Sequence, residues 1–175
     1  MIIGNKIVLR DKRSADAQDD YTWQTDPKLA QLDATPPLAI PFPQYLLDYA
    51  KELGYSSPIR RRFAIETPDG KHIGNCIYYD INETKGEAEL GIIIGNRDYW
   101  DKGYGADAVS TLVSYIFRET NLQRIYLKTL ESNSRAQACF KKCGFTPYGH
   151  LNKDGYNFML MEIHRKQWQE RQTET

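Results

Sequence analysis

The sequence has few of the residues that build disulfide frameworks or metal centres. Its three cysteines form an odd set without a C-x-x-C pair, which fits reduced thiols better than disulfides or a zinc site. Its three histidines are scattered and show no metal-ligand spacing. We therefore expect no metal. The residues concerned are Cys76, Cys139, Cys143, His72, His150 and His164.

The chain also lacks net charge and long apolar runs. Lysines and arginines number 23, as do aspartates and glutamates, so no whole-molecule field draws the protein to nucleic acid or to anionic lipid. Apolar runs such as Ile92-Ile93-Ile94 are far shorter than a bilayer span, so no membrane contact is expected. The N-terminus does not resemble a secretory signal, which predicts a cytoplasmic protein. Because the chain has no net charge, any anion site must depend on local groups.

A glycine loop stands out between a strand-like run, Glu87 to Gly95, and a helix-like run that ends near Glu119. Its sequence is Tyr99-Trp100-Asp101-Lys102-Gly103-Tyr104-Gly105-Ala106. Such a loop directs backbone N–H groups and the positive end of a helix to one place, which favours an anion. The alternative is an ordinary strand-to-helix turn. The G-x-G-x-x-G and Gly-Lys-Ser/Thr motifs of Rossmann and P-loop nucleotide sites are absent.

The chain length and the 41% hydrophobic content predict one domain, residues 1–175. Periodicity and turn residues indicate alternating strands and helices, with a long irregular segment or short helix between Thr25 and Pro43. The expected strands are Lys6–Arg10, Arg61–Thr67, His72–Ile81, Glu87–Gly95, Arg124–Leu130, Phe145–Leu151 and Tyr156–Ile163. The expected helices run from Ser14 or Asp16 to about Gln24, from Gln44 to Leu53, from Ala106 to about Glu119, from Asn133 or Ser134 to Cys143, and from Arg165 to Arg171.

The strand before the loop alternates two kinds of residue. Glu87, Glu89, Gly91 and Ile93 share one face, opposite Leu90 and its apolar neighbours. A glycine inside a strand indicates a bulge, a splay between strands or a ligand that approaches the backbone. We therefore expect Gly91 to mark one of these features.

Taken together, the Glu89–Ile94 strand, the Tyr99–Ala106 loop, the Arg124–Leu130 strand and the Asn133–Phe145 helix resemble the GNAT N-acetyltransferase family. The Tyr-Trp-x-Lys-Gly-Tyr-Gly form and the opening Ile7-Val8-Leu9-Arg10 are similar to its RimJ/RimL-like branch, which includes spermidine acetyltransferases. The resemblance is most specific from Glu87 to Phe145 and weakest from Thr25 to Arg60.

The resemblance implies an α+β fold with a twisted, mixed and mostly antiparallel sheet, splayed between the family's fourth and fifth strands and flanked by helices. Acetyl-CoA would lie in the opening and donate its acetyl group directly to a primary amine on a protein N-terminus, a polyamine or a small molecule. The family also permits a homodimer through an edge strand. The alternative function is a catalytically weak acyl-CoA-binding or regulatory module of the same fold.

The resemblance also assigns roles to residues. Asn133 would contact the pantetheine or thioester region and also cap its helix, and Ala136 and Phe140 follow it in the family's Asn-x-x-Ala-x-x-x-Tyr pattern. The backbone of Ile92, Ile93 and Ile94 would pair with the pantetheine arm as an added strand does. The pyrophosphate would be held by Trp100, Asp101, Lys102, Gly103, Tyr104, Gly105 and Ala106.

Acetyl transfer requires an ammonium to lose a proton before it attacks. Glu89 is the leading candidate for the base, with Asn133 as the second catalytic residue. Glu87 is the neighbour that could replace Glu89, and a solvated strand carboxylate is the alternative interpretation of Glu89 itself.

Two residues depart from the family pattern. Phe140 stands where many members have a tyrosine that reprotonates the leaving thiolate, so solvent or another group must supply that proton. Asp101 stands where a glycine is usual and would place a negative charge beside the phosphates unless its side chain turns outward.

The acceptor is weakly encoded. An aromatic pocket and an acidic surface are both possible from the sequence, although core packing and a solvated acidic face explain the same residues. The aromatic and apolar candidates are Tyr21, Trp23, Leu38, Phe42, Tyr78 and Tyr79, and the acidic ones are Asp19, Asp20, Asp26 and Asp33.

Overall fold

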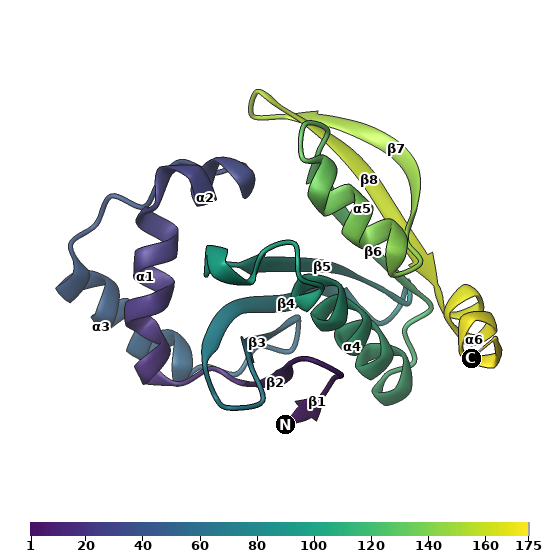
Figure 1. The fold of residues 1–175 in the computed structure, drawn as a ribbon, viewed down its shortest axis with the longest axis horizontal. Coiled ribbons are helices and arrows are strands. Elements are labelled where there is room, and N and C mark those ends of the chain that lie inside the picture. The colour runs from purple at the N-terminus through teal and green to yellow at the C-terminus, as the bar shows by residue number, and fades with distance from the viewer. Residues whose placement is uncertain (175) are drawn as a thin grey trace.

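A computed structural model describes residues 1–174, and these residues form one eight-stranded sheet in the order β1-β2-β3-β4-β5-β6-β8-β7 (Figure 1). Every neighbouring pair is antiparallel except β5 and β6. The strands are β1 Ile2–Ile3, β2 Val8–Asp11, β3 Arg60–Glu66, β4 His72–Asn82, β5 Glu87–Ile94, β6 Arg124–Leu130, β7 Thr146–Lys153 and β8 Tyr156–His164. The α+β sheet expected from the sequence is therefore confirmed.

The helices form two groups in Figure 1. The first three gather on one side of the molecule near β3, β4 and β5, whereas α4 and α5 lie next to the gap between β5 and β6. The α-helices are α1 Ala17–Thr25, α2 Pro27–Leu32, α3 Phe42–Leu53, α4 Tyr104–Glu119, α5 Ser134–Lys142 and α6 Arg165–Thr173, and the short 3-10 helices are η1 Ser14–Asp16 and η2 Arg97–Tyr99.

Most elements expected from the sequence are present, with ends shifted by a few residues. The Thr25–Pro43 segment contains α2, which begins at Pro27 because the Asp26 carboxylate accepts hydrogen bonds from the N–H groups of Lys28 and Leu29. The short strand β1 was not predicted. The outer strand β7 is largely exposed, and a homodimer through an edge strand stays a prediction.

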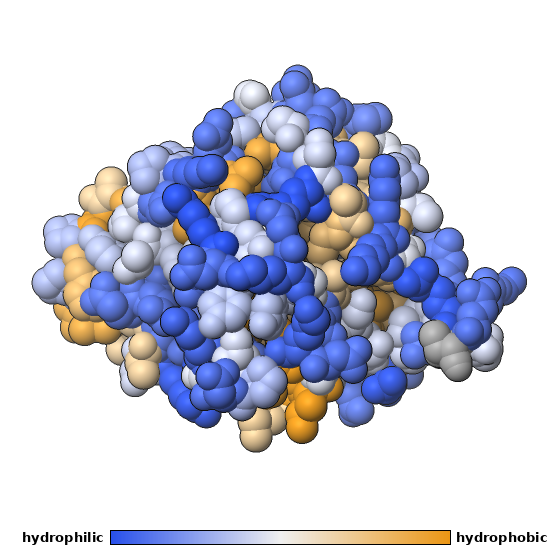
Figure 2. Space-filling model, in the orientation of Figure 1, coloured by the Kyte–Doolittle hydropathy of each residue, from blue (hydrophilic) through white to orange (hydrophobic). Residues whose placement is uncertain are grey.

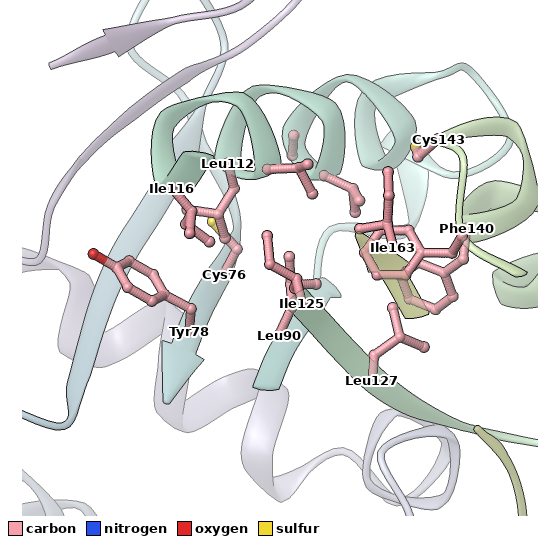
Figure 3. Packing of buried hydrophobic residues seen from close by; sticks show 14 of the residues in the cluster. Cys76, Tyr78, Leu90, Leu112, Ile116, Ile125, Leu127, Phe140, Cys143 and Ile163 are labelled. Atoms are coloured by element: carbon pink, nitrogen blue, oxygen red, sulfur yellow. The ribbon is translucent and has the colours of Figure 1, made fainter. Parts of the chain in front are cut away.

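The main core lies between α4 and the sheet. Helix α4 buries the face formed by Ala108, Val109, Leu112, Val113, Ile116 and Phe117, each at most 2% exposed. Figure 3 shows Leu112 and Ile116 pointing from α4 toward the strands that carry Leu90 and Ile125. Burial of this apolar surface fixes α4 against β5 and β6, the two strands that it connects.

Polar contacts hold α4 at both ends. At its N-terminal turn, the Asp107 carboxylate accepts hydrogen bonds from three consecutive backbone N–H groups, those of Asn5, Lys6 and Ile7, at 2.7–3.2 Å. Beyond its C-terminus, the Arg165 guanidinium donates to the carbonyl groups of Phe117, Thr120 and Leu122. Both contacts satisfy backbone groups that would otherwise be unpaired. They also fix the position of the glycine loop that precedes α4.

We expect Asp107→Ala to lower the free energy of unfolding by about 1–3 kcal/mol, because it leaves the three N–H groups without their carboxylate acceptor. Urea unfolding followed by circular dichroism measures the change. Glu119→Ala, at the exposed C-terminal end of the same helix, is the matched control. A loss no larger than that of the control would show that the Asn5–Ile7 turn does not depend on Asp107.

A buried ion pair joins β2 to η1 at the start of α1. The Arg10 guanidinium donates to both Asp16 carboxylate oxygens at 2.8 and 2.9 Å and to Glu66 at 2.6 Å. Burial alone would raise the pKa of Asp16, but the hydrogen bonds from Arg10 and from the Arg13 backbone N–H, together with the charge of Lys12, outweigh it and lower the pKa to about 2. Asp16 therefore stays ionised throughout the neutral range and attaches the first helical group to the sheet.

This pKa predicts acid sensitivity. Because the folded-state pKa of Asp16 lies below its ordinary value of 3.8, its ion pair stabilises the fold above that pH and is lost as the pH falls toward about 2. We expect Asp16→Asn to cost about 2 kcal/mol at pH 7 and to flatten the loss of stability between pH 5 and pH 2. Urea unfolding at several pH values tests this, with exposed Asp48→Asn as control. Equal slopes in wild type and Asp16→Asn would contradict it.

Candidate functional site

The strands β5 and β6 run together for only a short distance. Their parallel pairing joins Glu87 to Arg124, Ala88 to Ile125 and Glu89 to Tyr126. Beyond Glu89, β5 pairs with β4 alone, from Gly91 opposite Ile77 to Ile94 opposite Gly74. The splay expected from the sequence is therefore present.

A bulge at Gly91, the other feature that its position suggested, is absent. The β4–β5 register is regular there, and its irregularity lies between Tyr79 and Asn82. Gly91 instead packs closely against β4, because a Cβ at this position would lie 3.1 Å from the Ile77 side chain. Gly91 therefore lies where β5 has separated from β6.

A groove of about 380 Å³ occupies the splay. Its walls come from α2, the end of β5, the glycine loop and α5. The residues proposed from the sequence that line it are Ile92, Ile93, Ile94, Trp100, Asp101, Gly103, Gly105, Ala106, Asn133, Ala136 and Phe140. In Figure 2, apolar surface shows between the hydrophilic residues in the region of α2 and α5.

The glycine loop is shaped by left-handed backbone at two positions. Gly103, the residue that caps α4, has φ of +87°, and Asp101 has φ of +57°, a conformation that explains why glycine is usual there. The Asp101 side chain is 71% exposed, and its carboxylate lies 3.9 Å from the Arg135 guanidinium. The Trp100 indole N–H donates to the Ile94 carbonyl at 2.7 Å, which attaches the loop to β5.

Lys102 and Tyr104 do not line the groove. The Lys102 ammonium folds back to the Asp98 carbonyl at 2.7 Å, and the Tyr104 ring packs against Tyr99. Their contacts support the shape of the loop. The glycine motif in the sequence therefore does not predict which of its side chains face the groove and which fold back onto the loop.

Cations gather at the rim of the groove, where the sequence assigned no role to them. The Arg135 guanidinium lies 3.6 Å from the centre of the Trp100 ring, and the side chains of Arg97 and Lys28 approach the same ring at 5.9 Å. Arg135 and Lys142 also line the groove. The local positive charge that an anion site needs is thus present in a chain with no net charge. The only available signal was the position of Arg135 within the quoted Asn133–Ala136 motif.

Asn133 and Phe140 both line the groove. The Asn133 side-chain oxygen accepts from the Ala136 N–H at 3.2 Å, so this residue caps α5 and lines the groove at the same time. Phe140 is buried against Phe145 with its ring in the groove wall. No hydroxyl group is therefore present at this position.

Glu89 is buried at 8% exposure and belongs to a polar cluster that the sequence did not predict. Its carboxylate accepts a hydrogen bond from the Tyr79 hydroxyl at 2.6 Å and pairs with the Lys128 ammonium at 2.7 Å. Burial, together with the neighbouring Glu89 anion, raises the pKa of Tyr79 and keeps its hydroxyl protonated. Glu87, the alternative base, pairs instead with Arg124 at 3.0 Å.

A second cavity of about 510 Å³ adjoins the groove. Leu29, Asp33, Ile92 and Ile93 line both spaces. Tyr79 and Gly91 line the second cavity, so the Tyr79 side chain connects Glu89 with this space. We call it the acceptor cavity.

Only some of the acceptor candidates line this cavity. Trp23, Leu38 and Tyr79 do, whereas Tyr21 and Phe42 pack in the cluster between α1 and α3, and Tyr78 lies in the main core. Among the acids, Asp20 and Asp33 line it. Asp19 contacts His72, and Asp26 caps α2 and pairs with Arg97.

Residues 1–174 contain neither a metal-binding cluster nor a membrane-spanning helix. No group of three His, Cys, Asp or Glu side chains in this range lies close enough to hold a metal ion. No helix within it has both the length and the apolar character needed to cross a membrane.

Comparison with known proteins agrees with this geometry. An uncharacterized N-acetyltransferase p20 of Bacillus licheniformis is 26% identical over 147 residues, which cover 83% of this chain and 82% of that protein. The spermine/spermidine N(1)-acetyltransferase of Bacillus subtilis is 26% identical over 122 residues, or 67% of this chain and 77% of that protein.

Solved structures share the fold. The spermidine N-acetyltransferase of Vibrio cholerae in complex with CoA and spermine superposes with a TM-score of 0.84 at 23% identity, covering 94% of this chain and 98% of that one. The aminoglycoside acetyltransferase AAC(6')-Ib in complex with coenzyme A gives 0.78 at 20% identity, covering 95% and 99%.

The family model described as "Acetyltransferase (GNAT) domain" matches residues 6–146, which include the splayed strands, the glycine loop and the Asn133 helix. The chain therefore belongs to the GNAT acetyltransferase family, and it is an acetyl-CoA-dependent N-acetyltransferase.

Proposed function

We propose that the protein transfers the acetyl group of acetyl-CoA directly to a primary amine bound in the acceptor cavity. The observation that carries this proposal is that the groove and the acceptor cavity meet at Ile92 and Ile93, on the part of β5 that has lost its β6 partner. A thioester in the groove and an amine in the cavity would then meet at one backbone edge, as direct transfer requires.

The groove fits a phosphorylated donor. The Gly105 backbone is open to it, since a Cβ at this position would come no closer than 3.7 Å to a protein atom. The N-terminal N–H groups of the 16-residue helix α4 and the Arg135 guanidinium supply favourable charge for the pyrophosphate. The unpaired edge of Ile92–Ile94 supplies backbone groups for the pantetheine arm, and Asn133 supplies a side-chain amide.

We expect Gly105→Ala to weaken binding of CoA at least tenfold in isothermal titration calorimetry, because the added methyl group would occupy the space through which a phosphate approaches the backbone. Its thermal stability should not fall, since alanine favours helix over glycine by about 0.5–1 kcal/mol. Gly54→Ala, at the end of α3 and likewise free of close contacts, is the matched control. Unchanged CoA affinity would remove the Gly105 backbone from the proposed phosphate site.

Glu89 is our proposed base, and Tyr79 carries the proton to it. The ammonium of the acceptor passes one proton to the Tyr79 oxygen as the Tyr79 hydroxyl passes its own proton to the Glu89 carboxylate at 2.6 Å. The neutral amine then attacks the thioester carbonyl, so that its bond to the acetyl carbon forms, the nitrogen releases its second proton to solvent and the C–S bond breaks. Lys128 forms an ion pair with Glu89 at 2.7 Å. Because Phe140 has no hydroxyl, the leaving thiolate takes its proton from solvent or from another group.

Glu89→Gln should lower kcat/KM by about 100-fold or more and move the pH profile to higher pH, because the amine must then lose its proton to solvent. Tyr79→Phe keeps the ring and should produce a smaller loss with the same shift. Tyr126→Phe is the control, because Tyr126 pairs in register with Glu89 but lines neither space. Release of coenzyme A thiol gives the rates. An unchanged profile in Glu89→Gln would reject Glu89 as the base.

The acceptor class follows in outline from the relatives, whose names mention spermine, spermidine and aminoglycosides. A polyamine, an aminoglycoside, a protein N-terminus and a small amine are the candidates to assay. Saturable binding of CoA without thiol release on any of these amines would favour the alternative function, a catalytically weak acyl-CoA-binding module.

A further inference from the structure

The charges in the acceptor cavity are separated along its length. The end beside the groove carries Asp33, and the far end carries Lys12 and Arg62, which also line a third cavity of about 910 Å³. The carboxylate and the guanidinium therefore mark opposite ends of one space. On the basis of the proposed amine acetylation, we propose that the acceptor is a small molecule with one amine and, at its other end, an anionic group such as a carboxylate.

Asp33 is the carboxylate available to the amine. Asp33 is exposed to solvent at the walls of both the groove and the acceptor cavity, and within residues 1–174 no side chain lies within hydrogen-bond or ion-pair distance of it. The surrounding protein raises the pKa of Asp33 by desolvation, and the charge of Lys128 opposes this change. An ammonium placed at the junction would provide Asp33 with the ion pair that it lacks.

The second acid of the cavity, Asp20, is already neutralised. Its carboxylate pairs with the Lys12 ammonium at 2.7 Å and accepts hydrogen bonds from the Tyr49 hydroxyl at 2.8 Å and the Asn75 amide at 2.6 Å. Lys12 in turn is buried and bonded to both Asp20 and Asn75. Neither charge of this pair remains for a substrate, and the cavity has one carboxylate left for an amine.

Arg62 is the cation with hydrogen-bonding capacity to spare. One of its terminal nitrogens contacts Glu52 at 3.0 Å, and Glu52 lines the third cavity and not the acceptor cavity. A guanidinium carries five N–H donors in a planar fork, and such a fork suits a carboxylate. The Arg62 side chain is 30% exposed, so a ligand in the acceptor cavity can reach it.

A polyamine fits this arrangement poorly. Its second and third ammonium groups would approach the Arg62 guanidinium at the far end, where like charges repel. An amino carboxylate places opposite charges at both ends. A monoamine with an apolar tail would pair with Asp33 alone. Its kcat/KM should therefore lie between that of the amino carboxylate and that of the polyamine.

The experiment compares amines of one chain length: an ω-amino carboxylate, the corresponding diamine and the corresponding alkylamine, with spermidine added. We expect kcat/KM for the amino carboxylate to exceed that for the diamine at least tenfold, as measured by thiol release. If spermidine or the diamine is the better substrate, the inference is overturned while the acetylation proposal stands. If none is acetylated and aminoglycosides and peptides also fail, the proposed function itself fails.

Variants of β3 test the role of Arg62 directly. Arg62→Met should raise KM for the amino carboxylate about tenfold, leave the alkylamine unchanged and improve the diamine. Arg60→Met is the matched control, because Arg60 pairs with the same Glu52 but does not line the acceptor cavity. Retained turnover of the alkylamine shows that Arg62→Met is folded. Equal loss with all three amines, or no loss with the amino carboxylate, would contradict the inference.

Discussion

The site depends on the short parallel pairing between β5 and β6. Parallel neighbours need a long crossover, and here the crossover is η2, the glycine loop and α4. The N-terminus of α4 therefore lies at the carboxyl end of β5, where the two strands have already separated. One topological constraint thus produces both the opening and the positively polarised helix end that faces it. In open sheets of this kind, ligands bind outside the carboxyl ends of strands for the same reason.

A helix end is useful for binding only if it is held in place before the ligand arrives. Asp107 at one end of α4 and Arg165 beyond the other attach the helix to the first turn of the chain and to the start of α6. The buried face of α4 also holds the helix in place, because Leu112 and its neighbours have almost no exposed surface. The backbone donors of the loop are therefore positioned by contacts that lie outside the groove, and a ligand need not order them at its own cost.

Much of this could be predicted from the sequence, because it depends on local patterns. Alternation placed Glu89 opposite Leu90, and two glycines near a helix start indicated the loop. The pairing of Glu89 with Tyr79 and Lys128 could not be predicted, because these residues come from three strands that only the register brings together. The stacking of Arg135 on Trp100 could not be predicted either, because it depends on how α5 packs against the glycine loop. Lys102 was expected in the cofactor site because of its place in the glycine loop, but its ammonium bonds to the Asp98 carbonyl and does not line the groove.

The number of charged residues in a segment does not predict the charge of the cavity that the segment lines. The segment from Asp19 to Asp33 is rich in acids, which by itself suggests attraction of cations. Within residues 1–174, Asp19, Asp20 and Asp26 each lie beside a basic side chain, whereas the Asp33 carboxylate has no ion-pair partner. The electrostatic character of a cavity is set by the charges that the fold leaves unpaired within it, and pairing is a long-range property. The proposed dipolar acceptor rests on this pattern: the cavity combines a carboxylate without an ion-pair partner and a guanidinium that is only partly engaged.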